Sequence, residues 1–364
     1  MADRTASRIE GRKAEHLELS MNEPVEGAAG PGWGDVELVH EALPEVNLDE
    51  VDLGVELFGR QLRAPVMIAA MTGGHEGALE VNGVLARAAE RHGLAIGVGS
   101  QRAALQDSGL AHTYDVVRQS APRALVVGNL GAAQLIDQGA GAPLGLADAR
   151  AAVEMVRADA LAIHLNFLEE SVQPEGDRRT RGVGDAIGAI ARGLEVPVIA
   201  KETGAGMTRA TAQRLRDLGV AALDVGGAGG TNFAIIERMR AERQGDDRGA
   251  RLGRALAEWG IPTAVSVAGA AGCGLPVIAT GGVRSGLDAA KAFALGATLV
   301  GVARPLLRAA AEGDDALDRW IGTFLEELRT VVMLTGSRRP AELRVRPRVI
   351  SGRTRAWLDQ LGYA

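Results

Sequence analysis

The densest group of potentially reactive side chains lies in the segment HLNFLEESVQPEGD, residues 164–177. It follows the apolar run ADALAI and contains His164, Asn166 and the adjacent glutamates Glu169 and Glu170. Glu170 lacks the histidine or cysteine company that zinc prefers. A hard oxygen ligand beside a phosphate site is typical of magnesium, which one or two carboxylates commonly hold together with substrate phosphates. We therefore predict site roles for His164 and Asn166, and Mg2+ binding by Glu170.

Lysine is rare in this chain and occurs only at Lys13, Lys201 and Lys291, whereas every other basic residue is arginine. A lysine is a compact charge with a tunable pKa, which arginine does not mimic. Lys201 ends the apolar run VPVIAKE, and there it is a candidate for a Schiff base or for a cationic contact with a flavin or a phosphate. Lys291 lies in a plain helical pattern and has no evident role.

Further motifs indicate anion binding at the ends of predicted strands. The turns GGAGGT, which ends at Thr231, and GGVRSG, which contains Arg284, combine free backbone amides with helix starts, and the run VARP follows the last strand. The motif GSQR adds the hydroxyl of Ser100, the amide of Gln101 and the guanidinium of Arg102, which suits bidentate contact with an oxyanion. Tight turns alone would also explain the glycines, but their repetition favours phosphate binding.

Strand-length apolar runs must position these groups. Runs that are apolar on both faces are typical of parallel strands covered on both sides, and helix-like stretches separate them. This alternation, repeated eight times, predicts a (β/α)8 TIM barrel, in which the active site lies at the carboxyl ends of the strands. An open doubly wound sheet is the alternative, although no G-x-G-x-x-G motif follows an early strand. The runs are APVMIAA, LAIGVG, ALVVGNL, ADALAIHLN, VPVIAKE, AALDVGG, LPVIATGG and GATLVGVA.

The barrel is predicted to span residues 64–310 of a single domain, with extensions on both sides. Residues 1–63 form an N-terminal extension with a charged helix, a glycine-rich loop and a hairpin, VDLGVELFGRQLR, that closes the bottom of the barrel. Residues 311–364 form a C-terminal extension that contains the long amphipathic helix DALDRWIGTFLEELRTVVMLTG. The charged stretch RAERQGDDRGAR, residues 240–251, is predicted to be an exposed loop.

Composition narrows the possible functions. The 364 residues are 46% apolar and 24% charged, and a net charge of −6 argues against a general nucleic-acid surface. We find no apolar run of about eighteen residues, which a membrane span requires, and no apolar signal core among the first twenty residues. The single cysteine, Cys273, excludes an internal disulfide and suits a reducing cytosol. We therefore expect a cytoplasmic protein that acts on a small molecule, with no nucleic-acid or membrane partner.

Taken in order, the motifs resemble those of a known family. The chain is similar to the type 2 isopentenyl diphosphate isomerases, which are flavin enzymes of the FMN-binding (β/α)8 barrel class. GGVR alone is a weak signal, since many flavin barrels share it, but the ordered set is highly specific. The matching segments are RKAEH, AAMTGG, GVGSQR, GNLGAAQL, HLN, QPEGD, KETGAG, GAGGTNF, GGVRSGLDAAKAFALGA, ARPLL and ELRTVVMLTGS.

The resemblance implies interconversion of isopentenyl and dimethylallyl diphosphate, with reduced FMN, NADPH as the reductant and Mg2+, in a homo-oligomer that is a tetramer or an octamer. Glu170 would bind Mg2+, and Glu169, His164 and Asn166 would lie at the reacting part of the substrate. The substrate diphosphate would contact Arg12, Lys13, Ser100, Gln101 and Arg102. FMN would contact Ala70, Met71, Thr72, Ser100, Asn129, Lys201 and Thr231, and its phosphate would contact Gly282, Val283, Arg284, Ala303 and Arg304.

Glu169 is where the chain departs from this family, which typically has glutamine directly before the magnesium glutamate. Three hypotheses follow. Glu169 stays protonated and replaces the amide, or it ionises and becomes a second Mg2+ ligand or a proton acceptor, or the protein acts on another allylic substrate. Nearby metal favours the charged carboxylate, whereas burial and a bound diphosphate favour the neutral form.

Other classes of protein remain as alternatives. A flavin barrel that oxidises a hydroxy acid or reduces an enone is the nearest, but hydroxy-acid oxidases use a histidine base late in the barrel, and no histidine follows His164. A Schiff-base aldolase would use Lys201. A non-catalytic phosphate-binding barrel gains some support from Glu169, yet it leaves the remaining site motifs unexplained.

Overall fold

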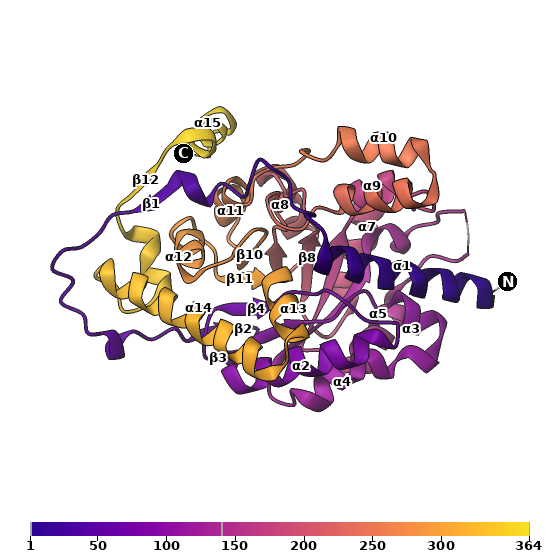
Figure 1. The fold of residues 1–364 in the computed structure, drawn as a ribbon, viewed down its shortest axis with the longest axis horizontal. Coiled ribbons are helices and arrows are strands. Elements are labelled where there is room, and N and C mark those ends of the chain that lie inside the picture. The colour runs from indigo at the N-terminus through magenta and orange to yellow at the C-terminus, as the bar shows by residue number, and fades with distance from the viewer. Residues whose placement is uncertain (1, 140, 364) are drawn as a thin grey trace.

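The computed structural model describes residues 2–139 and 141–363, with residues 2–10 described as backbone only. Within this part of the chain, parallel strands close a barrel in the order β10-β11-β4-β5-β6-β7-β8-β9 (Figure 1). The predicted TIM barrel is confirmed, and the open sheet is excluded because β11 pairs with β4. The barrel strands are β4 (Val66–Ile68), β5 (Ala95–Gly97), β6 (Leu125–Gly131), β7 (Ala160–Leu165), β8 (Val198–Glu202), β9 (Ala222–Asp224), β10 (Val277–Thr280) and β11 (Leu299–Val302).

Apolar side chains on both faces of each strand hold the barrel between two cores. Successive strand residues point to opposite faces, so alternate positions fill the interior while their neighbours face the helices. The interior contains Met67, Ala95, Leu125, Val127, Ala160, Ala162, Ile199, Ala222, Ile278 and Leu299. The outer core contains Val66, Ile68, Ile96, Val126, Leu161, Ile163, Val198, Val277 and Val300.

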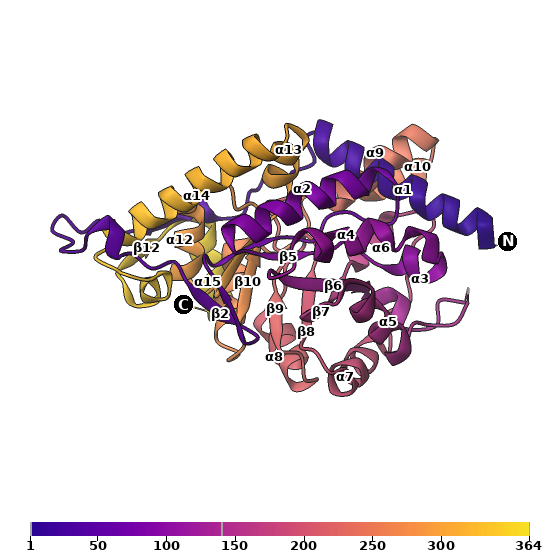
Figure 2. The ribbon, with the colours of Figure 1, turned by 90° about the horizontal axis from the view of Figure 1, so that it is seen from below.

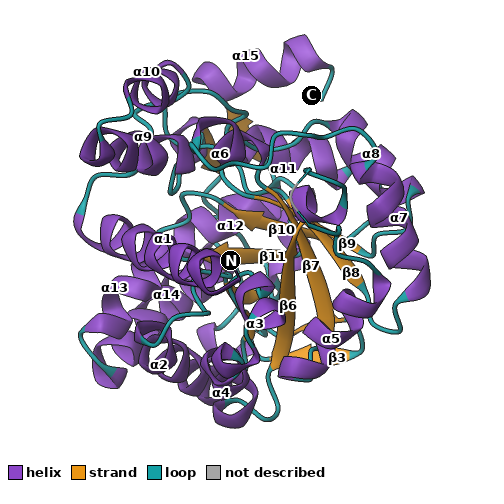
Figure 3. Ribbon diagram, turned by 90° about the vertical axis from the view of Figure 1, so that its right-hand side faces the viewer, coloured by secondary structure: helices purple, strands orange, loops and turns teal. Residues whose placement is uncertain are grey.

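Helices follow the strands and cover the barrel on all sides (Figure 3). Several end at a glycine in the left-handed region, as the sequence indicates; Gly93 after α2 is one, with φ 63°. The helices are α1 (Ala2–Asn22), α2 (Gly77–His92), α3 (Arg102–Gln106), α4 (His112–Ser120), α5 (Leu146–Val156), α6 (Phe167–Val172), α7 (Val183–Gly193), α8 (Arg209–Asp217), α9 (Phe233–Gln244), α10 (Asp247–Ala255), α11 (Thr263–Ala271), α12 (Gly286–Ala294), α13 (Arg304–Ala311), α14 (Asp314–Leu334) and α15 (Gly352–Leu361).

The prediction of an exposed loop over residues 240–251 is wrong, because this stretch forms the end of α9 and most of α10. Some of its charges are paired: Arg240 contacts Glu237 at 2.7 Å, and Glu242 contacts Arg254 at 2.9 Å. Gly245, with φ 71°, ends α9 and turns the chain into α10. A dense charge pattern therefore marked the polar faces of two helices rather than a loop.

A short hairpin closes the bottom of the barrel, as predicted. Strands β2 (Val55–Leu57) and β3 (Arg60–Leu62) pair antiparallel. Leu57 and Leu62 are buried in the same apolar cluster as the interior strand residues. Side chains therefore fill this end, which leaves the carboxyl ends of the strands as the open face.

The two extensions pair with each other, and the N-terminal one also crosses the open face. Strand β1 (Val36–Leu38) pairs antiparallel with β12 (Arg348–Ile350). Helix α14 lies beside α13 and α2 along one flank (Figure 2), and it matches the predicted amphipathic helix. Helix α1 contacts α3, α9 and α13, so it crosses the barrel at its carboxyl end. Among the described residues, none of the helices combines the length and apolar character that a membrane span needs.

Candidate active site at the carboxyl end of the barrel

A pocket lies at the carboxyl ends of the barrel strands, and residues that follow every one of these strands line it together with α1. This is where catalytic groups of a TIM barrel are found. Most residues that the sequence singled out meet here. The lining includes Arg12, Lys13, Ala70, Met71, Thr72, Ser100, Arg102, Asn129, His164, Asn166, Glu169, Glu170, Lys201, Thr231, Gly282, Val283, Arg284, Ala303 and Arg304.

Gln101 is the exception among the predicted site residues. Its side chain is fully buried below the pocket. Nε2 donates a 2.8 Å hydrogen bond to the carbonyl oxygen of Ala152, and Oε1 accepts one of 2.8 Å from the backbone amide of Asn129. Gln101 therefore ties the end of β5 to β6 and α5. The amide is already satisfied within the fold, so the expected contact between Gln101 and the substrate has no support in this geometry.

His164, at the end of β7, is held as a neutral imidazole. Its Nδ1 lies 2.8 Å from Oδ1 of Asn129, whose Nδ2 donates to the carbonyl oxygen of Val98 at 3.0 Å. This second bond fixes the orientation of the amide, so Nδ1 of His164 must carry the hydrogen. Burial, followed by the positive charges of Lys201 and Lys13, lowers the pKa of His164 to about 3. Nε2 is consequently a hydrogen-bond acceptor at neutral pH.

Glu170, in the short helix α6 that follows β7, is fixed by neighbouring donors. Its Oε2 accepts a 2.8 Å bond from the backbone amide of Asp177, and its Oε1 accepts from Nδ2 of Asn166 at 3.1 Å and from Nε2 of Gln134 at 3.3 Å. Oδ2 of Asp177 in turn accepts from Nη1 of Arg102 at 3.1 Å. Burial raises the pKa of Glu170, which is 4% exposed. The QPEGD turn thus folds back on this carboxylate and presents it to the pocket.

Glu169 occupies the neighbouring part of the pocket wall on α6. Its Oε2 accepts a 3.2 Å bond from Nδ2 of Asn166. Burial raises the pKa of Glu169 to about 7, and Glu170 and Glu237 act in the same direction, whereas His16 and Arg12 oppose them. The side chain therefore exchanges between its neutral and ionised forms near neutral pH.

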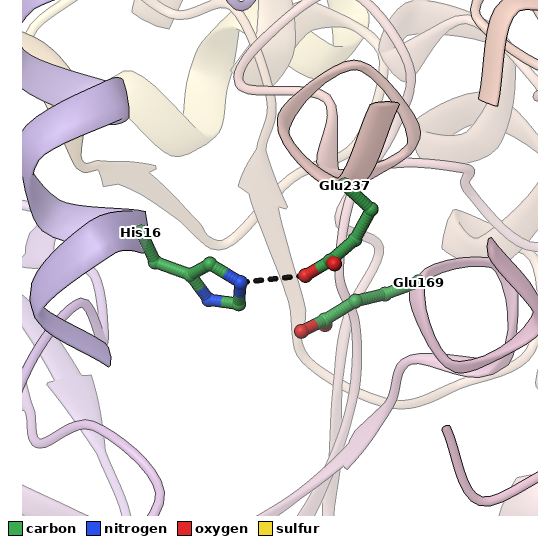
Figure 4. Close-up of side chains that lie close together, drawn as sticks. All are labelled: His16, Glu169 and Glu237. Carbon is green, nitrogen blue, oxygen red and sulfur yellow. Dashed lines mark hydrogen bonds and ion pairs between the residues drawn. The ribbon is translucent and has the colours of Figure 1, made fainter. Parts of the chain in front are cut away.

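Two residues that lie beside Glu169 were not among the predicted site residues. His16 of α1, Glu169 of α6 and Glu237 of α9 point toward one another (Figure 4), and their ligand atoms all lie within 4.8 Å of one another. Nε2 of His16 lies 2.6 Å from Oε1 of Glu237. His16 belongs to the RKAEH motif, so its signal was present. Glu237 lies one helical turn beyond Phe233, which lines the pocket, and this spacing was the available sign.

A cluster of positive charges forms the end of the pocket under α1. Nζ of Lys13 donates 2.7 Å bonds to the carbonyl oxygens of Gly73 and Ser100 and to the hydroxyl of Tyr114. Burial, and then the charges of Arg12 and Arg102, lowers the pKa of Lys13 to about 7. Nε of Arg12 is buried and has no hydrogen-bond partner within the described part of the chain. This end accumulates like charge, and an anionic ligand would relieve the repulsion.

The floor of the pocket holds Lys201. Its Nζ donates to the carbonyl oxygen of Glu202 at 3.0 Å and lies 3.9 Å from Oδ2 of Asp224. Neither Oδ2 of Asp224 nor Oγ1 of Thr280 has a hydrogen-bond partner among residues 2–139 and 141–363. Buried polar atoms of this kind usually have a partner. The floor therefore retains hydrogen-bonding capacity for a polar ligand.

The glycine turns after β9 and β10 form the opposite end. Gly282 has φ 67°, and a Cβ there would lie 2.6 Å from the carbonyl oxygen of Gly229, so only glycine allows this approach. Beside these turns, Nη2 of Arg284 lies 2.6 Å from Oε2 of Glu26, and Nη1 of Arg304 lies 3.3 Å from its Oε1. Glu26 thus pairs with both arginines that were predicted to meet a cofactor phosphate.

Comparison with known proteins identifies the family. A family described as FMN-dependent dehydrogenase matches residues 144–350. An isopentenyl-diphosphate delta-isomerase of Methanoregula boonei is 48% identical over 351 residues, which cover 96% of each chain. The protein of the same name from Halobacterium salinarum is 45% identical over 362 residues, which cover 99% of each chain. The chain belongs to the isopentenyl-diphosphate delta-isomerase family. The resemblance inferred from the motifs is confirmed.

Solved structures agree with the fold of this family member. A mandelate oxidase variant has a TM-score of 0.62 at 20% identity, covering 96% of this chain and 98% of its own. A protein described as a lactate oxidase from Pediococcus acidilactici has a TM-score of 0.65 at 16% identity, covering 95% and 94%. At such low identity these oxidases show the shared barrel and nothing about the reaction.

The pocket of this isopentenyl-diphosphate delta-isomerase family member fits FMN. A flavin needs polar groups for its ring and cations or backbone amides for its phosphate. The chain provides Lys201 and the unpartnered hydroxyl of Thr280 at the floor, and Arg284 and Arg304 beside the glycine turns. Thr72, Asn129 and Thr231 also line the pocket. The donor set therefore matches the cofactor that the FMN-dependent family requires.

Proposed function

We propose that this protein interconverts isopentenyl and dimethylallyl diphosphate on reduced FMN, with Mg2+ bound at Glu170. The observation that carries this proposal is that one pocket joins two separate cationic ends. Arg284 and Arg304 lie at one end, Arg12, Lys13 and Arg102 lie at the other, and the neutral imidazole of His164 lies between them. Two anionic groups held at opposite ends of a barrel mouth are what a flavin phosphate and a substrate diphosphate require.

The substrate diphosphate would bind under α1. Burial and mutual repulsion lower the pKa of Lys13 to about 7, and a diphosphate would offset that repulsion. Arg12 and the hydroxyl of Ser100 face the same space, whereas Gln101 does not. Binding energy from this remote group holds a small alkene in place for the reaction.

Magnesium would bind at the oxygen cluster around Glu170. The carboxylate is oriented by the amides of Asp177 and Asn166, and the nearest acidic neighbour in the turn is Asp177 itself. Such a site offers a single oriented carboxylate and leaves positions for water and phosphate oxygens, which suits the coordination of Mg2+. The metal would connect the wall of the pocket to the diphosphate.

Reduced FMN supplies, when bound, an electron-rich ring that stabilises positive charge developing on the alkene. The chain contributes the surroundings of the reaction. Lys201 and neutral His164 lie at the floor, and α1 covers the mouth, where it would exclude water that adds to a carbocation and gives an alcohol. No net redox change occurs, because the alkene gains a proton at one carbon and loses one at another.

Glu169 would act in its protonated form. Its Oε2 accepts from Asn166, which leaves Oε1 to carry the proton and to donate as the usual glutamine amide would. A pKa of about 7 keeps a substantial protonated fraction near neutral pH, so this form is available for the reaction, while an ionised Glu169 and another allylic substrate remain the alternative hypotheses. NADPH as the reductant, a cytoplasmic location and a homo-oligomer (tetramer or octamer) complete the proposal, and the single cysteine, which is buried, suits a reducing compartment.

The test is to purify the protein, record its flavin spectrum and assay isomerisation of the five-carbon diphosphates with Mg2+, with and without NADPH. We expect a yellow protein that isomerises only after reduction, and Glu169→Gln is expected to retain or increase turnover. If neither form isomerises, the assignment is wrong. A hydroxy-acid oxidase would instead consume oxygen with lactate or mandelate, and a Schiff-base aldolase would be colourless and trapped by borohydride through Lys201.

A further inference from the structure

The cluster of His16, Glu169 and Glu237 carries an inference beyond the proposed reaction. We propose that these residues form a second metal site, separate from Glu170, that takes a divalent transition-metal ion such as Zn2+ or Mn2+. The three side chains come from α1, α6 and α9 and converge at the wall of the pocket (Figure 4). An imidazole nitrogen with two carboxylates is a donor set for these metals, whereas Mg2+ prefers oxygen ligands alone.

The distances between the donors suit such an ion. Bonds of about 2.0–2.2 Å to Zn2+ place the ligand atoms of a tetrahedral site about 3–4 Å apart. Here Nε2 of His16 and Oε1 of Glu237 are 2.6 Å apart, and all three donors lie within 4.8 Å of one another. A metal would widen the first separation and draw Glu169 closer, and both movements amount to small side-chain shifts.

The surroundings orient the donors for this purpose. Nη1 of Arg240 donates to Oε2 of Glu237 at 2.7 Å, which leaves Oε1 directed at His16. Arg240 is itself neutralised by Glu15 at 2.7 Å and by Glu175 at 3.3 Å, so its charge does not oppose a cation. Outer contacts that fix a ligand in this way are typical of metal sites.

Asn166 provides an independent observation beside the cluster. It is 4% exposed, and its Nδ2 donates to Oε2 of Glu169 and to Oε1 of Glu170. Its Oδ1 is buried without a hydrogen-bond partner among the described residues. A buried amide oxygen without a partner points to a ligand beside Glu169 and Glu170, and water bound to a metal ion would satisfy it.

Two features connect the site to solvent and to this chain in particular. His16 and Glu169 line the pocket, so an ion can enter and keep an open position for water. Glutamine at position 169, which is typical of the family, would supply a neutral amide in place of a charged ligand. We therefore expect the second metal site in this chain because of Glu169, and we do not expect it in family members that have glutamine at this position.

Calorimetric titration of the FMN-loaded, full-length protein with Zn2+, in excess Mg2+ to fill the oxygen site, tests the proposal. We expect one equivalent of Zn2+ in the wild type and binding weakened by about 100-fold or more in Glu169→Gln and His16→Gln. Glu169→Gln keeps the shape of the side chain, so loss of folding is not expected. Equal Zn2+ affinity of wild type and Glu169→Gln, or no uptake by the wild type, would overturn the proposal.

Matched controls separate this site from other carboxylates. Glu76→Gln removes one partner of the exposed His112–Glu76 pair, in which the charged atoms are 3.2 Å apart, and should leave Zn2+ binding unchanged. Glu170→Gln should weaken Mg2+ binding and retain the Zn2+ equivalent. Pulsed electron paramagnetic resonance of bound Mn2+ should show nitrogen coupling in the wild type that is lost in His16→Gln. Persistence of that coupling would exclude His16 as a ligand.

An inhibition assay extends the test and rests on the proposed function. Zn2+ would hold Glu169 as a metal-bound carboxylate and so remove the proton that the reaction needs. We expect Zn2+ to inhibit the wild-type isomerase at concentrations about tenfold or more below those that inhibit Glu169→Gln. If the protein proves not to be an isomerase, the calorimetric result still stands, so the two proposals fail separately.

Discussion

The two cationic ends of the pocket differ in how their charge is balanced. Arg284 and Arg304, beside the glycine turns, share the carboxylate of Glu26. Arg12 and Lys13, on α1, have no carboxylate partner in the described part of the chain, and burial, followed by the charges of Arg12 and Arg102, lowers the pKa of Lys13 to about 7. The charge of the first end is partly neutralised before a ligand binds, whereas the repulsion between Arg12 and Lys13 at the second end is not offset by a carboxylate on either residue.

The two ends therefore differ in the free-energy cost of binding an anion. A cofactor phosphate must either displace Glu26 from Arg284 and Arg304 or share these arginines with Glu26. Either way, the apparent affinity for the cofactor is weaker. A diphosphate at Arg12 and Lys13 replaces no carboxylate on these residues, so most of its Coulomb energy contributes to binding. The comparison predicts opposite effects when charge is removed from each end.

Removing a cation from the end under α1 should have the largest effect. Arg12→Gln removes one charged partner of the diphosphate that is not engaged by a carboxylate, and we expect kcat/KM for isomerisation to fall by about 100-fold, mainly through KM. FMN affinity should stay unchanged, because Arg12 lies at the other end from the glycine turns. Arg304→Gln is the matched control and should weaken FMN binding instead. Equal loss of FMN from both variants would break the comparison.

Removing the carboxylate at the other end should strengthen cofactor binding. Glu26→Gln frees Arg284 and Arg304 for a phosphate, and we expect the Kd for FMN to fall by about tenfold, as measured by fluorescence quenching of the flavin. The KM for the diphosphate should not change. Weaker FMN binding in Glu26→Gln would show that Glu26 positions these arginines rather than competing with the phosphate.

Most of the fold could be predicted from the sequence, because runs that are apolar on both faces are compatible with few structures. Each predicted barrel run contains one observed strand, and the hairpin and α14 also match. The exposed loop over residues 240–251 failed because charge density alone does not distinguish a loop from a solvated helix face. Arg240 pairs with Glu237 at helical spacing within α9, whereas the pair of Arg254 with Glu242 forms only because α10 packs on α9.

The site residues could be predicted where a motif marks the end of a strand. Gln101 illustrates the limit, because adjacent residues of GSQR point in opposite directions and the motif does not say which side chain turns inward. His16 and Glu237 illustrate another limit. They come from helices far apart in the chain, so their contact with Glu169 depends on how α1 crosses the barrel and how α9 packs on α6.

The charge balance under α1 should also appear in the pH dependence of substrate binding. Lys13 is protonated below its pKa of about 7, and a diphosphate favours the protonated form. As pH rises from 7 to 8, Lys13 loses its proton in the free enzyme, and we expect the KM for the diphosphate to rise about fivefold. Lys13→Met should bind weakly but without this pH dependence. A flat profile in the wild type would mean that Lys13 remains charged in the free enzyme.

Glu26 and Glu169 should differ in how they change thermal stability with pH. This is the smallest of the predicted effects. Glu26 is paired with arginines, whereas burial raises the pKa of Glu169 from 4.5 to about 7. The folded state therefore holds a proton that the unfolded chain releases, so the stability linked to Glu169 is full below pH 4.5 and is lost as pH rises through 7. In the absence of metal and diphosphate, we expect the Tm of Glu169→Gln relative to wild type to increase by about 2 °C between pH 5 and 8.

Glu154→Gln, at an exposed position of α5, should show no such change. A pH-independent difference for Glu169→Gln would mean that His16 keeps Glu169 ionised throughout, which would remove the protonated carboxyl from the proposed reaction and leave the metal site as its role.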